Sequence, residues 1–271
     1  MGLEPKELSR MLETAVNAAR LAGARAMKEI NHITTRIKSA DQLVTQADTI
    51  CQKIIVERIS RMYPNDGFIA EEGEGAGLFK QKPKAGSKTW WAIDPIDGTN
   101  NFAKGMLLFS TAIAAMYEGE PVVGVVYDPA TDSMFTGVKG GEAQLNGSTI
   151  TVSDDGFDKF SSVGMDSFFD NGVPKWVIAL MERARSRTLG SSCLQLAYLA
   201  RGSLIGIVFV RPKLWDIAAG AVIAESAGAN ISDWSGNKLF PVDLDKYQGQ
   251  EFKTLGANRK VYDEILKLLS T

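Results

Sequence analysis

The sequence predicts a fold of the α/β (α+β) class in which layers of helix and sheet are stacked. Three observations lead to this prediction: two helical patterns at the start, a run of strand-like segments in the middle, and strands that alternate with helices afterwards. The chain has 271 residues and is 45% hydrophobic, which is enough for a sizeable core. We expect two closely joined halves, residues 1–150 and residues 151–271, with a soft boundary near residue 150.

The first part of the chain carries the two helical patterns. Apolar residues such as Leu8 and Met11 recur at helical spacing over residues 5–30, which predicts a long amphipathic helix. Isoleucines along one stripe predict a second helix over residues 45–62. Residues 73–88 are rich in Gly and Lys and lack periodicity, so they are predicted to form a mobile loop.

Strand-like segments follow. A short apolar strand at residues 90–93 runs into Asp94 and Pro95, and Pro95 is expected to end it because proline has no N–H to donate. Turn signals between apolar segments predict an antiparallel meander over residues 109–117, 121–127 and 133–138. In the second half, strands are expected at residues 161–166 and 205–210. The helices that alternate with them are expected over residues 174–185, 192–201, 215–227 and about 258–270.

Charge and composition argue against several classes of protein. The 30 Lys and Arg residues and 32 Asp and Glu residues give a net charge of −2 without a long block of either sign, unlike a nucleic-acid-binding surface. No apolar run approaches the roughly 20 residues that cross a bilayer, and the first residues lack a signal-peptide core. Cys51 and Cys193 are too few and too distant for a disulfide framework. We therefore expect a cytoplasmic protein without nucleic-acid or membrane partners.

The sequence contains a single histidine, His32. A Ser-His-Asp triad, a histidine-rich zinc site or a phosphohistidine mechanism would each have to depend on this residue, whose simplest role is an exposed helix end. Chemistry in this chain is therefore expected to use carboxylates, hydroxyls and metal ions.

The strongest local signal lies in residues 91–100, WAIDPIDGTN. Asp94 and Asp97 are close enough to face one point, and two such carboxylates repel each other unless a cation lies between them. Ligands that are all oxygen favour a hard ion such as Mg²⁺. The backbone N–H groups of Gly98 and Thr99 could then hold a phosphate beside the ion. The alternative for this motif alone is ordinary turn chemistry.

Three further acidic sites strengthen the case. Glu71 and Glu72 end a short apolar segment, Asp48 begins the second predicted helix, and Asp216 begins the helix after Trp215. Each has a simple explanation by itself, as a solvated pair or as a carboxylate at a helix N-terminus. The combination of all of them has no such explanation.

Four segments resemble the signatures of the inositol monophosphatase family, in the family's order and spacing. They are residues 43–48, 70–73, 91–102 and 215–228. The resemblance implies a layered αβαβα sandwich, shared with the fructose-1,6-bisphosphatases. It also implies a lithium-sensitive, Mg²⁺-dependent phosphomonoesterase, and a homodimer, since the family is commonly dimeric.

The resemblance further implies the roles of single residues. Two or three Mg²⁺ ions would be held by Glu71, Asp94, the backbone carbonyl of Ile96, Asp97 and Asp216. Asp48 would lie near the first ion through water, and Thr99 together with Glu71 would orient the attacking water. Two divalent ions roughly 4 Å apart can clamp a phosphoryl group and activate that water, so a histidine base is not needed.

Substrate contacts are expected from the metal motif and from a second loop. The candidates are Asp97, Gly98, Thr99, Gly190, Ser191, Ser192, Phe209, Lys213 and Asp216. Residues 189–193 resemble the family's Gly-Ser loop, but Phe209 stands where inositol-preferring members have an acidic residue that receives ring hydroxyls. The alternative for Phe209 is a core strand residue. Arg211 and Lys213 would favour a second anionic group on the substrate, unless they are solvated strand-end charges.

The resulting hypothesis is a phosphomonoesterase of a small sugar or polyol phosphate that resembles inositol 1-phosphate. Enzymes with the same chemistry stay open: a fructose-1,6-bisphosphatase, a histidinol-phosphate phosphatase, or a 3′-phosphoadenosine-5′-phosphate phosphatase. A non-catalytic regulatory or binding protein of the same fold is the alternative from a different class. The retained metal ligands and Thr99 argue against it.

Overall fold

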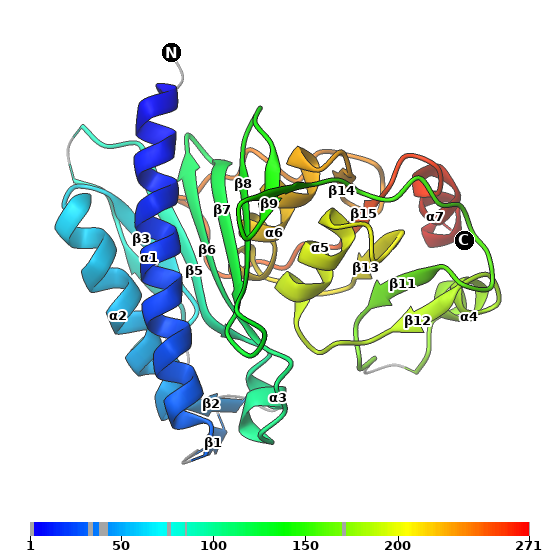
Figure 1. The fold of residues 1–271 in the computed structure, drawn as a ribbon, viewed down its shortest axis with the longest axis horizontal. Helices are drawn as coiled ribbons and strands as arrows, with labels where there is room; N and C mark the ends of the chain where they lie inside the picture. The colour runs from blue at the N-terminus through cyan, green and yellow to red at the C-terminus, as the bar shows by residue number, and fades with distance from the viewer. Residues whose placement is uncertain are drawn as a thin grey trace.

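The computed structural model describes residues 3–31, 35–37, 43–74, 77–84, 86–169 and 172–270. These residues form five layers, helix, sheet, helix, sheet and helix, which confirms the predicted sandwich (Figure 1). The eight-stranded sheet uses residues 67–150 and the five-stranded sheet uses residues 162–257. The division of the chain into halves near residue 150 stays a prediction. His32 lies outside the described residues.

The first layer consists of α1 (Pro5–Glu29) and α2 (Gln46–Met62), close to the predicted ranges 5–30 and 45–62. The buried face of α1 is made of small residues, five of them alanines without exposed surface. Gly23 on this face contacts the ring of Tyr127 so closely that an added Cβ would lie 2.7 Å from it. The small side chains therefore let the long helix lie directly on the sheet.

The first sheet has the order β10-β9-β8-β7-β6-β5-β3-β4. Its strands are β3 (Gly67–Ala70), β4 (Phe79–Gln81), β5 (Thr89–Asp97), β6 (Ser110–Tyr117), β7 (Glu120–Asp128), β8 (Ser133–Val138), β9 (Ala143–Leu145) and β10 (Ser148–Ile150). The predicted antiparallel meander is confirmed by β6, β7 and β8. Only β3 and β5 pair in parallel within this sheet's described strands.

The expected loop at residues 73–88 contains a strand, so that part of the prediction is wrong. β4 pairs with β3, and Lys80 donates hydrogen bonds to the carbonyls of Asp245 (2.9 Å) and Tyr247 (2.8 Å). The strand has only three residues, too few to show a period in the sequence.

The middle layer is formed by α5 (Ser192–Ala200) and α6 (Leu214–Ser226), packed between the two sheets. The second sheet has the order β12-β11-β13-β15-β14. Its strands are β11 (Ser162–Met165), β12 (Arg185–Arg187), β13 (Gly206–Phe209), β14 (Asn230–Ser232) and β15 (Thr254–Ala257). The outer helices α4 (Lys175–Met181) and α7 (Tyr262–Leu269) cover its far face (Figure 1). The small elements β1 (Thr35–Ile37), β2 (Leu43–Thr45) and α3 (Thr99–Ala103) lie beside the first sheet.

The second half differs from the prediction at two helix boundaries. The helix expected over residues 174–185 ends at Met181, and Arg185 already belongs to the edge strand β12. The last helix begins at Tyr262 rather than near residue 258, because the Asn258 side chain accepts hydrogen bonds from the amides of Lys260 and Val261 just before it. A turn closed by the Asn258 side chain thus stands where the first helical turn was expected.

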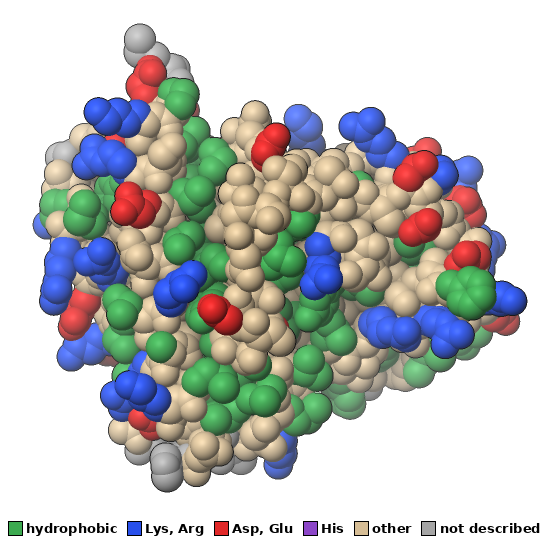
Figure 2. Space-filling view, viewed as in Figure 1, with side chains coloured by type: hydrophobic (Ala, Val, Ile, Leu, Met, Phe, Trp, Pro, Cys, Tyr) green, Lys and Arg blue, Asp and Glu red, His purple; other side chains and the backbone are tan. Residues whose placement is uncertain are grey.

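The surface agrees with the absence of a long charge block in the sequence. In Figure 2, Lys and Arg side chains are interspersed with Asp and Glu over the visible face. Among the described residues, no helix has both the length and the apolar character needed to span a membrane.

Candidate metal and phosphate site

The site begins at the end of β5, where the strand is irregular. β5 pairs with β6 in register through Asp94, and the register shifts before Asp97 pairs with Ser110. The shift accommodates Pro95, whose carbonyl accepts a hydrogen bond from the Thr111 hydroxyl (2.9 Å). The expectation that Pro95 ends the strand is therefore wrong. The bulge turns Asp94 and Asp97 toward the same point, as expected from their spacing.

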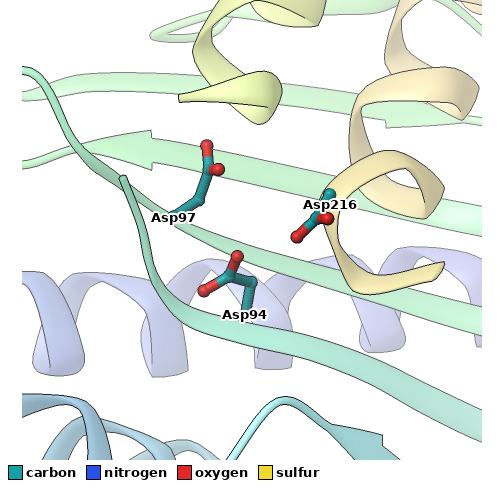
Figure 3. Close-up of side chains that lie close together, drawn as sticks. All are labelled: Asp94, Asp97 and Asp216. Atoms are coloured by element: carbon teal, nitrogen blue, oxygen red, sulfur yellow. The ribbon is translucent and has the colours of Figure 1, made fainter. Parts of the chain in front are cut away.

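Three carboxylates converge at this point. One oxygen atom from each of Asp94, Asp97 and Asp216 lies within 4.8 Å of the other two, and Figure 3 shows the three side chains close together. Asp94 and Asp97 come from β5, and Asp216 lies in the first turn of α6. The amide of Lys213 donates to Asp216 Oδ2 at 2.6 Å and so holds this side chain at the helix start. Residues more than a hundred positions apart in the sequence thus form one cluster.

The cluster shows the electrostatic signature of a cation site. Burial, and then the charge of Glu71, raises the pKa of Asp94 well above its ordinary value. Burial, and then the charge of Asp97, raises the pKa of Asp216 to about 7. Neighbouring buried carboxylates are costly to ionise together unless positive charge compensates them. A set of donors made only of oxygen fits Mg²⁺.

Asp97 is held by the N-terminus of α5. Its carboxylate accepts hydrogen bonds from the Ser191 hydroxyl, the amides of Cys193 (2.9 Å) and Ser192 (3.1 Å), and the Ser110 hydroxyl (3.2 Å). Burial raises the pKa of Asp97, and these hydrogen bonds counteract part of the rise. Ser191 is buried, contacts Asp97 and does not line the cleft, so its predicted contact with the substrate stays a prediction.

Asp48 and Thr99 form a second group beside the carboxylates. Asp48 has no exposed surface and accepts hydrogen bonds from the Thr45 amide (2.8 Å) and hydroxyl (2.5 Å), in a capping box at the start of α2. The Thr99 hydroxyl lies 3.2 Å from Asp48 Oδ1 and 3.0 Å from the Ile96 carbonyl. Burial raises the pKa of Asp48 to about 6. Asp48 therefore contacts Thr99 and lies outside the lining of the cleft.

Glu71 is fixed by a residue that the sequence analysis missed. Gln52 on α2 donates to the Glu72 carbonyl (2.6 Å) and accepts from the Glu72 amide (2.9 Å). These two bonds hold the backbone next to Glu71, whose own amide donates to the Ile93 carbonyl. Gln52 lies on the buried face of α2 between Asp48 and Ile55, so only its polar character at a core-facing position could have singled it out.

Two glycines allow the loops to meet behind the carboxylates. Gly98 has φ 97° and Gly190 has φ 70°, in the left-handed region that favours glycine. A Cβ at Gly190 would lie 2.7 Å from the side chain of Asn101. Asn101 in turn donates to the carbonyls of Leu108 and Leu189, both at 2.7 Å. Asn101 is a second positioning residue that sequence reasoning missed, because its partners are distant in the chain.

The carboxylates open into a cleft of about 960 Å³. Among the residues expected at the site, those lining the cleft are Glu71, Asp94, Ile96, Asp97, Gly98, Thr99, Gly190, Ser192, Lys213 and Asp216. Lys213 lies at the mouth with Arg211, where its ammonium contacts the Gly249 carbonyl (2.9 Å) and Glu251 (3.2 Å). The cleft therefore brings most of the predicted residues together.

Phe209 does not belong to the cleft. It lies in β13 without exposed surface and packs in the core between the sheets, so the expected substrate contact is wrong and the core-residue alternative is correct. A carboxylate that was not predicted lines the cleft nearby. Asp166 follows β11, accepts a hydrogen bond from the Val210 amide (2.6 Å), and has its pKa raised to about 6 by burial. Its signal was an acidic residue at the end of a predicted strand, as at Asp94.

Comparisons with known proteins agree with this geometry. The sequence profile of the inositol monophosphatase family matches residues 7–270. The chain is 38% identical over 236 residues to the Nus factor SuhB of Vibrio cholerae, covering 83% of this chain and 86% of the relative. It is 33% identical over 239 residues to the inositol-1-monophosphatase of Mesorhizobium japonicum, covering 85% and 88%. An IMPase structure from Thermotoga maritima superposes with a TM-score of 0.83 at 29% identity, covering 96% and 97%.

Proposed function

This chain belongs to the inositol monophosphatase family, and from that premise we propose that it is a Mg²⁺-dependent phosphomonoesterase of a small sugar or polyol phosphate. The observation that carries the proposal is the convergence of Asp94, Asp97 and Asp216 within 4.8 Å at the base of a cleft. Their raised pKa values are typical of groups arranged for chemistry rather than for stability. The residues would hold two or three Mg²⁺ ions, with Glu71 and the Ile96 carbonyl completing the oxygen ligands.

The bound ions would supply positive charge that favours ionisation of the attacking water and neutralises the leaving oxygen. The chain's own groups would orient the reactants. The Thr99 hydroxyl donates its hydrogen bond to Asp48 or to the Ile96 carbonyl. Its oxygen keeps lone pairs and lines the cleft, so it can accept a hydrogen bond from water there. Glu71 would accept the second proton of that water, while the amides of Gly98 and Thr99 would donate to phosphate oxygens.

The test is an assay of several phosphate esters with controlled metal content. We expect turnover with Mg²⁺, no turnover in excess EDTA, and poor turnover with Ca²⁺, because its longer and looser coordination misplaces the reactants. Release of inorganic phosphate provides the measurement. Undiminished turnover in EDTA would contradict the proposed function.

Thr99→Ala tests the orienting hydroxyl. We expect kcat to fall by roughly 10²-fold, because a misplacement of the attacking water by about 1 Å can cost that much. Thr99→Ser retains the hydroxyl and is the matched control, expected to keep most of the rate. Mg²⁺ affinity, measured by calorimetry, should change little in either variant. Equal losses in Thr99→Ala and Thr99→Ser would show that the methyl group matters and the hydroxyl does not.

A regulatory or binding role is the second candidate function. The observation in its favour is that relatives with 33–38% identity bear the name Nus factor SuhB rather than that of an enzyme. The two roles are separable, since turnover requires the acidic cluster and a binding role does not. A variant that lacks turnover but still rescues a strain without this protein would favour the binding role.

The cellular setting is part of the same proposal. We propose a cytoplasmic homodimer that is inhibited by Li⁺, in keeping with the family resemblance of the metal motifs. The fructose-1,6-bisphosphatase, histidinol-phosphate and 3′-phosphoadenosine-5′-phosphate alternatives use the same site, so the ester assay also distinguishes among them.

A further inference from the structure

The cleft is larger than its metal-binding half requires. Its volume of about 960 Å³ is at the upper end of what pockets for drug-sized ligands occupy, whereas the carboxylates and the Gly98 turn line one part of it. Four aromatic residues, Phe168, Phe169, Trp176 and Trp234, also line the cleft, together with polar and charged residues that include Asp166, Arg211 and Lys213. A polyol phosphate has no apolar surface to cover such a wall.

Three of the four aromatic rings pack against one another. The ring of Trp176 meets those of Phe169 and Trp234 edge to face, with centroids 5.8 Å and 5.5 Å apart and interplanar angles of 81° and 75°. Lys253 lies over the Trp234 ring, 5.0 Å from its centroid. Trp176 is buried, whereas Phe168 remains 68% exposed at the cleft. A fixed wall with an exposed ring at its edge is suited to stacking with a planar ligand.

The cleft is also lined by a carboxylate that precedes the aromatic pair Phe168 and Phe169 in the sequence. This carboxylate belongs to Asp166, and the Val210 amide holds one of its oxygens at 2.6 Å. A carboxylate fixed in this way accepts a hydrogen bond from an O–H or N–H group of a ligand. Stacking surface and a fixed acceptor together match a flat ring that carries hydrogen-bond donors.

We propose that the alcohol half of the substrate carries a planar nitrogen-containing ring, which stacks on the wall formed by Phe168, Phe169, Trp176 and Trp234 while Asp166 accepts a hydrogen bond from it. This inference rests on the proposed phosphatase function and names the class of its substrate. Nucleoside monophosphates are sugar phosphates of this class, and phosphate esters of imidazole alcohols are its smaller members.

The test compares esters that differ only in the ring. AMP is paired with ribose 5-phosphate, and L-histidinol phosphate with ethanolamine phosphate, because both members of a pair are primary phosphate esters with the same groups next to the ester oxygen and only one member carries the ring. We expect kcat/KM to favour the ringed member of one or both pairs by roughly fivefold to a hundredfold, the usual effect of one stacked base. Equal kcat/KM values within both pairs would overturn the inference and leave the phosphatase function intact.

Single substitutions test where the ring of the substrate binds. Phe168→Ala and Trp234→Leu should reduce the preference severalfold, with ringless esters turned over as before. Phe160→Ala is the matched control, since Phe160 is 71% exposed and lies outside the cleft lining. In Asp166→Asn, which keeps an acceptor for the Val210 amide, KM for the ringed ester should rise while kcat for the ringless ester stays constant. A preference that survives both aromatic substitutions would refute the proposed position of the ring.

A binding measurement separates this inference from the proposed function. Calorimetry with adenosine and with imidazole tests the aromatic wall without any turnover. Binding that is weakened by Phe168→Ala but not by Phe160→Ala would support the ring site even if no ester were hydrolysed. Absence of binding by both probes would overturn the inference, as would equal kcat/KM values.

Discussion

Asp94→Asn is expected to lower kcat by about a thousandfold or more while making the metal-free protein more stable. The loss follows because Asp94 is one of the proposed ligands of the ions, and metal-ion stabilisation of transition-state charge is worth several kcal/mol. The gain follows because the neutral amide removes a buried charge that Glu71, Asp97 and Asp216 oppose. A change of about 1 kcal/mol moves the Tm of a chain of this size by roughly 2–4 °C.

The measurements are phosphate release with Mg²⁺ and thermal unfolding in EDTA. Asp128→Asn is a matched control, because Asp128 is also buried but accepts hydrogen bonds from Ala130 and Thr131 and lies outside the cleft lining. This control should keep its turnover and lose stability. Near-normal turnover in Asp94→Asn would refute the proposal that Asp94 is a metal ligand, and a lower Tm in EDTA would refute the electrostatic argument.

The second large effect concerns pH and metal removal. In EDTA, we expect the free energy of unfolding to fall as the pH rises from about 4 through about 7. The pKa of Asp48 is raised to about 6 and that of Asp216 to about 7, against about 3.9 for an aspartate in an unfolded chain. In this window the folded protein binds more protons than the unfolded chain, so the slope of stability against pH is negative. The stability that protonation of Asp48 and Asp216 contributes is fully present below about pH 4 and is lost above about pH 7.

Mg²⁺ should reverse this dependence. Ion binding needs ionised carboxylates, so the Tm gained on adding Mg²⁺ should be larger at pH 8 than at pH 5. Thermal unfolding at both pH values, with EDTA and with saturating Mg²⁺, provides the measurement. Asp94→Asn should show a weaker pH dependence in EDTA. A Tm in EDTA that is constant or rises between pH 5 and pH 8 would contradict the prediction.

The sequence was most informative where the signal was periodic or chemically unusual. The helices α1 and α2 are long enough for a period to be counted, and the meander alternates strands with recognisable turns. The pairing of Asp94 with Asp97 was predicted from their spacing, and Asp216 was added because four segments resemble the signatures of the inositol monophosphatase family. Here chemistry, rather than propensity, pointed to the site.

The rest depended on contacts between distant parts of the chain. Gln52 and Asn101 act on backbone groups 20 and 88 residues away, which local patterns do not reveal. Phe209 was misplaced because its position in a motif was compared with a family pattern, whereas strand packing decides which way its side chain faces. Asp166 was missed because it reaches the cleft from the end of β11, the strand next to the one that carries Phe209, and strand pairing is not visible in the sequence.

The order of the proposed metal ligands along the chain has a consequence for biosynthesis. Asp94 and Asp97 belong to the first sheet, whereas Asp216 lies on a helix of the middle layer that is synthesised much later. Chains leave the ribosome at about 5–20 residues per second, and the N-terminal part folds first. A nascent chain therefore carries two mutually repelling aspartates for several seconds before α6 can emerge. Mg²⁺ would therefore bind the finished protein far better than the emerging chain, because the third aspartate of the proposed site is present only after α6 has been made. Ion binding would then stabilise a fold that is already almost complete.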